Sequence, residues 1–504
     1  EWSPQSLLLF FPGYRLDPMN PLSAPSRIPS AERFPCFRWL FVQTRTDVSL
    51  DTGRDLIHQR KKGLTMLRTL RLATTLRCST RAAATAAAMG VAFSAALCLP
   101  AAAQMKRPAL SRSVVVPAAS KAQTGDKGVR MHANVRFLDN PSTSPSELPP
   151  YLGYGYETPA SLACVYGLAP KTKGCNPNST TVNSTGGSQT IAIVDAFDDP
   201  NAAADLAYFS QQFGLPYSDA KFHVVYATGS VPAEDPTGGW ELEESLDVQY
   251  AHAMAPNATI YLVEAASTYD SDLFAAVQVA SNLVVCGKTT ACPKGSTGRG
   301  EVSMSFSSAE FPQESYYDPV FTTPGVVYLA ASGDAAGTGY PCVSPNVVCV
   351  GGASNSRSIE TGDLMAQIGW SDAGSGISYY EPIPAFQKSH PQVAKQLGGY
   401  RGVPDVAANA NPTTGAWVWM TFPYEGSQTG WFTVGGTSLA TPLSAGMVNA
   451  TGGFVSSSAE YLADIYNAKR YVTDITYGAC YYYSSYYAGP GWDLCTGMGS
   501  PRLH

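Results

Sequence analysis

Short apolar runs alternate with longer amphipathic segments between residues 190 and 331. The runs are rich in Val, Ile and Ala, which is typical of buried parallel strands, and the segments between them place apolar residues at helical spacing. This alternation predicts an α/β fold with a doubly wound, mainly parallel central sheet flanked by helices. The predicted strands are Thr190–Asp195, Lys221–Ala227, Thr259–Glu264, Val302–Phe306 and Val326–Ala331, and the predicted helices are Pro159–Gly167, Asn201–Phe213, Leu242–Ala253, Ser271–Val284 and Leu439–Val448.

Acidic residues follow two of the predicted strands. Asp195 ends the first strand, and Asp334 comes shortly after the last. Ligands of open α/β sheets bind at the carboxyl ends of the strands, so we expect both carboxyl groups at the edge that carries the functional site. After Ala353 the pattern loosens and predicts loops and short strands.

A glycine-rich turn precedes the last predicted helix and places Ser438 at its start. Backbone N–H groups and the helix dipole at such a position favour developing negative charge, which suits a nucleophilic serine. Ser and Thr are also ordinary helix caps, so the turn alone fits a structural role equally well.

The predicted helix that starts near Leu242 carries several carboxyl groups. Glu243 and Asp247 are four residues apart and therefore share one face, where close, partly buried carboxyl groups would raise one another's pKa. Glu244, three residues before Asp247, is a second candidate for the active glutamate. The spacing alone favours a solvated acidic face, to which Glu241 and Glu244 would belong.

Three motifs in this order resemble those of sedolisin-type serine-carboxyl peptidases, which have a subtilisin-like fold. They are Glu-x-x-x-Asp at 243–247, Ser-Gly-Asp-x-x-Gly at 332–337 and Gly-Thr-Ser-x-x-x-Pro at 436–442. The resemblance runs from about Gly155 to Pro501.

The resemblance implies a role for each motif residue. Ser438 would be the nucleophile, Glu243 its general base, Asp247 the group that orients Glu243, and Asp334 a protonated donor to the oxyanion. These roles predict a secreted endopeptidase that acts at acidic pH through an acyl-enzyme. The alternative is a catalytically silent relative that is exported and binds peptides.

The same resemblance places the substrate next to Ser305, Phe306, Ser307, Gly436 and Thr437. The family usually has Ser-Trp-Gly at the first three of these positions. Because residues 306 and 307 differ from that pattern here, the resemblance implies no particular residue preference around the scissile bond.

The resemblance also implies one structural calcium ion in a C-terminal loop. Asp474 and Asp493 would supply carboxylates, and Ile475, Gly489 and Gly491 would supply backbone carbonyls. These are the hard oxygen ligands that Ca²⁺ prefers. Two turn-forming aspartates would give the same pattern without a metal ion.

Three residues would also fit a histidine-dependent site. Asp195, His252 and Ser438 follow the order of the triad in subtilisin-like proteases. His252 lies in Ala-His-Ala rather than in the His-Gly-Thr of subtilisins, so we interpret it as structural and Asp195 as a strand-end acid.

The first hundred residues have a different composition. We interpret 1–65 as a translated upstream region, 66–103 as a signal peptide, 104–150 as a linker or short propeptide and 151–504 as the peptidase domain. The signal has a basic start, an alanine-rich apolar run and small residues at 101–103, which predicts export from a bacterial cell to the periplasm or the medium.

Charge and cysteine content limit the possible partners. Residues 104–504 contain 20 basic and 33 acidic residues, a net charge of −13, which disfavours nucleic acid and, after removal of the signal, membrane surfaces. We expect a monomer with protein or peptide substrates. Eight cysteines follow the leader in four local pairs, which predicts disulfides, with nearest-neighbour pairing favoured.

Overall fold

The computed structural model describes residues 113–139, 156–452, 454–468, 472–480 and 486–502. The chain divides into two units, 1–94 and 95–504, and every described residue belongs to the second. The predicted upstream region and signal peptide therefore lie outside the described residues. The division between linker or propeptide and peptidase domain, near residue 150, also falls outside them.

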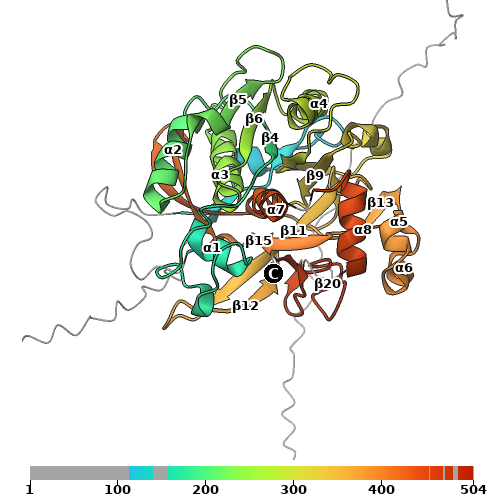
Figure 1. Ribbon diagram of the computed structural model, residues 1–504. Helices are drawn as coiled ribbons and strands as arrows, with labels where there is room; N and C mark the ends of the chain where they lie inside the picture. Colours follow the sequence, from blue (N-terminus) through green and yellow to red (C-terminus); the bar gives the residue numbers. More distant parts are fainter. Residues whose placement is uncertain (1–112, 140–155, 453, 469–471, 481–485, 503–504) are drawn as a thin grey trace, which may run out of the picture. The chain divides into compact units, whose positions relative to one another are not determined.

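A mainly parallel sheet runs through the described unit (Figure 1). Its strands follow the order β12-β11-β9-β7-β4-β6-β5, with β15 also paired to β11. All of these pairs are parallel except β12 with β11. The strands are β4 (Thr190–Ala196), β5 (Phe222–Tyr226), β6 (Thr259–Ala265), β7 (Gly300–Met304), β9 (Val326–Ala331), β11 (Val348–Arg357), β12 (Leu364–Gly369) and β15 (Val406–Asn409).

Helices cover both faces of this sheet, which confirms the predicted fold class. On one face α3 (Gly239–Met254) packs against α2 (Ala202–Phe213) and α7 (Thr437–Thr451), and α4 (Asp270–Cys286) covers the other face (Figure 1). The predicted helices agree with these bounds to within a few residues. The smaller helices are α1 (Pro159–Val165), α5 (Ala385–Lys388), α6 (Pro391–Leu397) and α8 (Ser458–Ala468).

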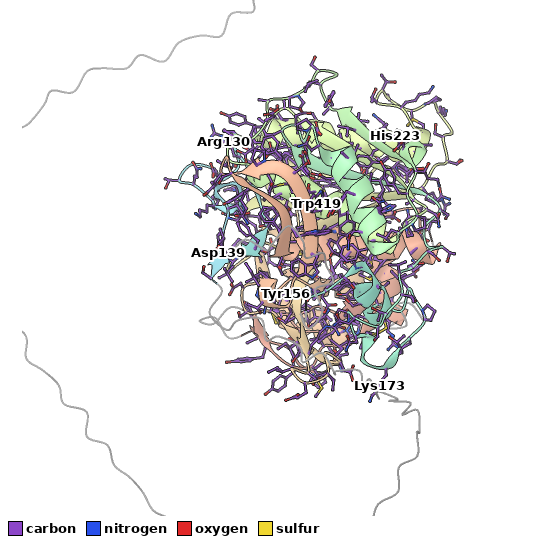
Figure 2. All side chains as sticks on the ribbon, turned by 90° about the vertical axis from the view of Figure 1, so that its left-hand side faces the viewer. Arg130, Asp139, Tyr156, Lys173, His223 and Trp419 are labelled. Atoms are coloured by element: carbon purple, nitrogen blue, oxygen red, sulfur yellow. A yellow bond between two sulfur atoms is a disulfide. The ribbon has the colours of Figure 1, made fainter. Side chains whose placement is uncertain are left out.

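A long hairpin follows where the sequence predicted only loops and short strands. β16 (Ala416–Tyr424) and β17 (Gln428–Gly435) pair antiparallel, and β16 packs against α2 and α3. Trp419 of β16 packs against Trp431 of β17, with ring centroids 5.1 Å apart and the rings tilted by 59° (Trp419 is labelled in Figure 2). The hairpin depends on these tertiary contacts, because its sequence has no regular apolar alternation.

Residues 113–139, here called the N-terminal segment, are part of the fold, although the sequence suggested that folded structure begins near Tyr151. β3 (Arg136–Leu138) pairs with both β1 (Val114–Val115) and β17. β2 (His132–Ala133) pairs with β8 (Phe306–Ala309), which also pairs with β10 (Gly339–Tyr340). These strands are too short to show a sequence period, and they form by pairing with distant strands.

Further short strands and four disulfides complete the described unit. The disulfides join nearest neighbours, as favoured from the sequence: Cys164–Cys175, Cys286–Cys292, Cys342–Cys349 and Cys480–Cys495. No helix among the described residues is both long enough and apolar enough to cross a membrane. The remaining strands are β13 (Gly376–Pro382), β14 (Tyr400–Val403), β18 (Val472–Thr473), β19 (Ala479–Cys480), β20 (Tyr486–Tyr487) and β21 (Ser500–Pro501).

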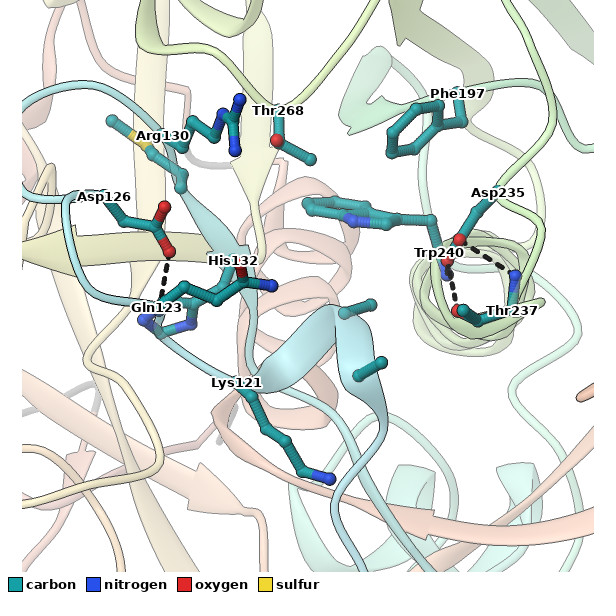
Figure 3. A pocket seen from close by; sticks show the side chains of 13 residues that line it. Lys121, Gln123, Asp126, Arg130, His132, Phe197, Asp235, Thr237, Trp240 and Thr268 are labelled. Atoms are coloured by element: carbon teal, nitrogen blue, oxygen red, sulfur yellow. Dashed lines mark hydrogen bonds between the residues drawn. The ribbon is translucent and has the colours of Figure 1, made fainter.

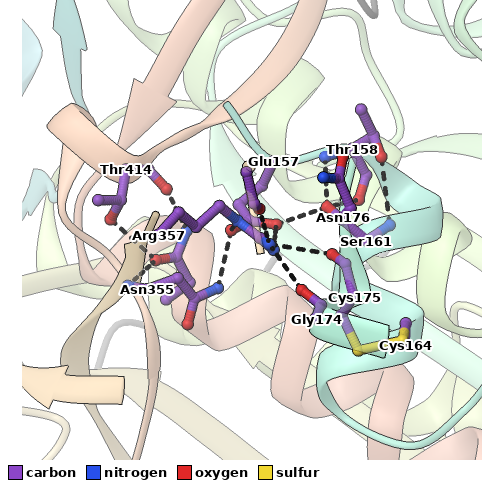
Figure 4. Close-up of polar contacts among 12 residues, drawn as sticks. Glu157, Thr158, Ser161, Cys164, Gly174, Cys175, Asn176, Asn355, Arg357 and Thr414 are labelled. Carbon is purple, nitrogen blue, oxygen red and sulfur yellow. Dashed lines mark hydrogen bonds and ion pairs between the residues drawn. A yellow bond between two sulfur atoms is a disulfide. The ribbon is translucent and has the colours of Figure 1, made fainter. Parts of the chain in front are cut away.

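A buried ion pair connects the start of α1 to the end of β11 (Figure 4). The carboxylate of Glu157 accepts two hydrogen bonds from the guanidinium of Arg357, each 2.7 Å long, and a third from Asn355 Nδ2 at 3.1 Å. Arg357 also donates to the carbonyls of Gly174 and Cys175, next to the first disulfide. The pair therefore joins three segments that are distant in the sequence.

We predict that Glu157→Ala lowers the free energy of unfolding by about 3–5 kcal/mol, because it leaves the Arg357 cation buried without its carboxylate. Urea unfolding in a Ser438→Ala background, which prevents self-digestion, measures the change. Glu360→Ala, at an exposed glutamate in the neighbouring turn, is the control and should change stability by less than about 0.5 kcal/mol. An equal effect of both substitutions would contradict the prediction.

Candidate active site

Ser438 lies in the first turn of α7, directly after the β17 strand. Gly436 is the N-cap of this helix and has φ = +102°, a conformation that favours glycine. A Cβ at this position would collide with the carbonyl oxygen of Asn134 and would lie 2.8 Å from Asp334 Oδ2. The glycine thus lets a second backbone approach the buried Ser438 closely.

The carboxyl groups of α3 are buried, so the interpretation of this helix as a solvated acidic face is wrong. Every residue of α3 is buried, because the helix packs against α2, α7, β4 and β16. Glu243 and Asp247 have no exposed surface. Burial disfavours the ionised form of a carboxyl group, so the carboxyl groups of this helix tend to keep their protons.

The structure distinguishes between the two candidate glutamates. Burial and then the nearby Asp195 raise the pKa of Glu243 well above its usual value, while a contact with the Ser438 hydroxyl lowers it. Burial also raises the pKa of Glu244, but the next causes are Glu264 and Asp199, and Ser438 is not among them. Glu243 is therefore the glutamate that faces Ser438.

Asp195, Glu243 and Asp247 form one buried cluster. Burial and then Asp195 raise the pKa of Asp247, with a further contribution from Glu243, and a hydrogen bond involving Ser305 lowers it. Burial raises the pKa of Asp195 to about 8. The sequence placed Asp195 at the end of its strand but did not predict its contact with this cluster. Three carboxyl groups so close together share protons rather than ionise independently.

The hydroxyl of Ser438 has more than one neighbour. Its Oγ lies 3.2 Å from the carbonyl oxygen of Ser305 and accepts a hydrogen bond of 3.1 Å from the backbone N–H of Asn134. Within the described part of the chain, neither carboxylate oxygen of Glu243 has a complete hydrogen bond. The hydroxyl can therefore turn from Ser305 to Glu243 without breaking another bond of that carboxyl group.

Asp334 lies beside the start of α7, as its place after β9 predicted. Its Oδ1 accepts hydrogen bonds from the N–H and the hydroxyl of Thr437, at 2.7 and 2.9 Å. Burial raises the pKa of Asp334 to about 7, although the guanidinium of Arg136 lowers it. The Nε of Arg136 is 3.5 Å from Asp334 Oδ2, and its Nη1 is 2.6 Å from Asp372 Oδ2.

The predicted substrate-binding residues surround Ser438. Ser305 separates β7 from β8, whose backbone pairs with β2 at Phe306 and Ser307. The side chain of Phe306 is fully buried and belongs to the core. Its backbone forms part of the β8 edge that pairs with β2. The sequence missed two neighbours of the site, Asn134 and Arg136, because nothing in the pattern of residues 104–150 distinguishes them from a linker.

A cavity of about 210 Å³ lies between the N-terminal segment and the start of α3 (Figure 3). Trp240 and Phe197 form an aromatic wall with ring centroids 6.4 Å apart. Asp235 and His132 also line the cavity, and His132 pairs with Ser307 of the predicted substrate edge. His132 therefore links the wall of the cavity to that edge.

His252 does not face the site. Burial lowers its pKa to about 4, and its ring contacts the backbone of Pro216 and the ring of Tyr217. None of the contacts described for His252 involves Asp195 or Ser438. The interpretation of His252 as structural agrees with this position.

The two aspartates of the predicted calcium site contact the same turn. Asp474 Oδ2 accepts a hydrogen bond of 2.7 Å from the N–H of Gly491, and Asp493 Oδ2 accepts one of 2.9 Å from the N–H of Gly489. Asp493 Oδ1 also accepts bonds from the backbone of Cys495 and Thr496. Both carboxylates thus reach the same turn, where they accept backbone N–H bonds, and carboxylate oxygens are of the kind that Ca²⁺ prefers. The described residues hold no group of three or more His, Cys, Asp or Glu side chains that could bind a metal.

The chain is similar to several characterised peptidases. It is 30% identical over 343 residues to kumamolisin of Bacillus sp. (strain MN-32), which covers 63% of this chain and 59% of kumamolisin. It is 30% identical over 184 residues to sedolisin of Pseudomonas sp. (strain 101), covering 33% and 29%, and 26% identical over 345 residues to tripeptidyl-peptidase 1 of Macaca fascicularis, covering 60% and 56%. The chain thus spans less than two thirds of each relative. A comparison with protein-family profiles gives no match.

A solved structure has the same fold. Pseudomonas sedolisin, complexed with two molecules of pseudo-iodotyrostatin, superposes with a TM-score of 0.54 and 22% identity, over 69% of this chain and 95% of that chain. Its fold is the subtilisin-like arrangement predicted from the sequence motifs. The chain is therefore similar in sequence to peptidases of the sedolisin family, and it shares the fold of a sedolisin.

Proposed function

We propose that this chain is a serine-carboxyl endopeptidase that hydrolyses protein or peptide substrates at acidic pH. The observation that carries the proposal is the position of Ser438 at the start of α7, between the buried Glu243 and the carboxyl group of Asp334. The peptidase homologues support the same reaction class.

The nucleophile is the hydroxyl of Ser438, and Glu243 removes its proton as the oxygen attacks the substrate carbonyl. Asp247 orients Glu243, and Asp195 belongs to the same cluster. Because the three carboxyl groups share protons, one of them must be ionised for Glu243 to act as a base. The proton on Glu243 then passes to the leaving amine, and water hydrolyses the resulting ester of Ser438.

The oxyanion is stabilised by two donors, the backbone N–H of Ser438 and the protonated carboxyl group of Asp334. The positive end of the α7 dipole lies at the same point. Thr437 fixes the rotation of Asp334 through two hydrogen bonds to Oδ1, which leaves Oδ2 to carry the proton toward the substrate.

We also propose export to the periplasm or the medium, a monomeric state and one structural calcium ion. Asp474 and Asp493 would hold the ion with the carbonyls of Ile475, Gly489 and Gly491. The ion would neutralise two carboxylates and tie β18 to the 489–493 turn. The alternative function, binding of peptides without cleavage, would use the same substrate edge but would not need the carboxyl groups.

The first test removes the nucleophile. Ser438→Ala should lower kcat/KM for casein at pH 3–6 by at least about 10⁴-fold, because no acyl-enzyme can form. The control is Ser444→Ala, at a buried serine two turns further along α7 whose hydroxyl bonds to Ala440, and it should retain activity. Binding of casein by the wild-type chain without cleavage at any pH would favour the peptide-binding alternative.

The second test concerns the pH dependence. The pKa of Asp334 is raised to about 7, so its proton is present in acid and is lost as the pH rises through about 7. Activity should fall over the same range, because an ionised carboxylate repels the oxyanion. Asp334→Asn keeps a donor at every pH and should move this alkaline limit upward.

The control for this variant is Asp372→Asn, which changes a more exposed carboxylate near Arg136. Its alkaline limit should move by less than that of Asp334→Asn. The measurement is kcat/KM from pH 3 to 9. An unchanged alkaline limit in Asp334→Asn would contradict the assigned role.

The third test concerns calcium. Chelation should lower the melting temperature of the Ser438→Ala chain, and added Ca²⁺ should restore it, because the ion binds only the folded loop. Asp493→Asn should remove this dependence, whereas Asp464→Asn, at an exposed position of α8, should not. A melting temperature that is independent of Ca²⁺ would exclude the structural calcium ion.

A further inference from the structure

The N-terminal segment passes directly over the nucleophile. On the N-terminal side of the residue that contacts Ser438, β2 pairs antiparallel with β8, with His132 opposite Ser307 and Ala133 opposite Phe306. On the C-terminal side of that residue, β3 pairs antiparallel with β17, with Arg136 opposite Gly435. An extended chain that adds a strand to an exposed edge is the usual way in which a peptide binds to a sheet. Only Asn134 and Val135 lie between the two paired stretches.

The backbone of Asn134 is hydrogen-bonded to Ser438 on both sides. Its N–H donates to Ser438 Oγ at 3.1 Å, and its carbonyl oxygen accepts the N–H of Ser438 at 3.2 Å. The carbonyl oxygen and Asp334 Oδ2 both crowd the point where a Cβ of Gly436 would lie. The carbonyl therefore points toward the two groups that would stabilise an oxyanion.

The side chain of Asn134 is bound at both ends of its carboxamide. Its Nδ2 donates to the carbonyl oxygen of Ser305 at 3.0 Å, and its Oδ1 accepts from the hydroxyl of Ser307 at 3.1 Å. A carbonyl oxygen can only accept, so the group that faces Ser305 must be the NH₂. All three residues are buried.

These two contacts discriminate between side chains. A leucine would leave the Ser307 hydroxyl buried without its acceptor and the Ser305 carbonyl with only the Ser438 hydroxyl as a donor. An aspartate would place an acceptor against the Ser305 carbonyl. Sites built to bond a polar group reject analogues that lack it more strongly than apolar pockets reject a change of size. Ser307 stands at the position where the family usually has glycine. The hydrogen bond from the Ser307 hydroxyl to Asn134 Oδ1 is therefore a feature of this chain.

We propose that the site cleaves peptides after asparagine, and that its first substrate is its own Asn134–Val135 bond. This inference rests on the proposed function. Ser438 Oγ attacks the Asn134 carbonyl carbon, and its proton goes to Glu243. The C–N bond to Val135 breaks, and Val135 leaves as a free amine with that proton. Water then hydrolyses the ester, which gives an Asn134 carboxylate and restores Ser438.

The surroundings of Val135 fit a leaving group. Its N–H donates to the hydroxyl of Ser120 at 3.2 Å, and both residues belong to the same N-terminal segment. After cleavage, residues that precede Val135 are held only by non-covalent contacts. Substrates can then compete for the edge of β8 that β2 occupies.

The test begins with the full chain at pH 3–7, followed by intact mass and N-terminal sequencing. We expect a new N-terminus at Val135 in the wild type and none in Ser438→Ala. The acid-treated chain is then given a peptide that copies residues 130–139 and the same peptide with Asn134→Leu. The Asn peptide should be cleaved with at least about tenfold higher kcat/KM.

Two enzyme variants separate recognition of the carboxamide from other effects. Ser307→Ala should reduce the preference for Asn over Leu several-fold. Ser308→Ala, whose hydroxyl bonds to the carbonyl of Ala309 and not to Asn134, should keep the wild-type preference. The readout is a ratio of two substrates on one preparation, so partial misfolding of a variant does not change it.

The outcomes distinguish this proposal from the proposed function. Hydrolysis of casein with no break after Asn134, or with equal cleavage of the two peptides, would overturn the asparagine preference and leave the peptidase function intact. No hydrolysis of casein or of either peptide at any pH would overturn both. A break after Asn134 together with loss of preference only in Ser307→Ala is the result that supports the proposal.

Discussion

The interior of this protein holds several carboxyl groups with few positive charges to balance them. The fold depends on keeping these buried groups protonated. Asp195, Glu243 and Asp247 are fully buried together, and Asp334 is almost as deep. Burial disfavours the ionised form, so it raises the pKa of each group. A raised pKa in the folded state means that these groups stabilise the fold in acid, and that stability is lost as the pH rises from about 4 through about 7–8. The proposed acidic activity and the acidic stability thus have one physical origin.

This burial is possible because α3 lies in the interior along its whole length. The sheet, α2 and α7 cover it, and the β16–β17 hairpin closes the remaining side. The ends of the parallel strands then bring Asp195 and Ser305 to the same edge as the start of α7. Carboxylates that would repel one another on an exposed helix share protons at this edge.

The N-terminal segment gives the active site an internal ligand. Its backbone pairs on both sides of Ser438, and Asn134 contacts the hydroxyl, the backbone N–H and the edge of β8. Arg136 from the same segment lies against Asp334 and lowers the pKa of the carboxyl group that must keep its proton. Arg136 follows the proposed cleavage point, so it stays attached to the peptidase domain and beside Asp334 after the Asn134–Val135 bond is cut. The segment therefore both occupies the site and lowers the pKa of its oxyanion donor.

The sequence by itself determined the α/β class, the helices from α1 to α4 and α7, and the main-sheet strands β4 to β7 and β9, because these follow from local periodicity. Short spacings favoured the four disulfide pairs, and the motif residues around Ser438 were indicated by the resemblance to a peptidase family. It left Glu243 and Glu244 as alternatives, since spacing on a helix does not say which neighbours each face will contact. Only the tertiary structure decided that Glu243 faces Ser438, that Asp195 joins the cluster and that Asn134 lies in the site. Each of these depends on contacts between residues distant in the chain, and short strands such as β2 have no sequence period of their own. Their position comes from pairing with strands that the rest of the fold has already placed.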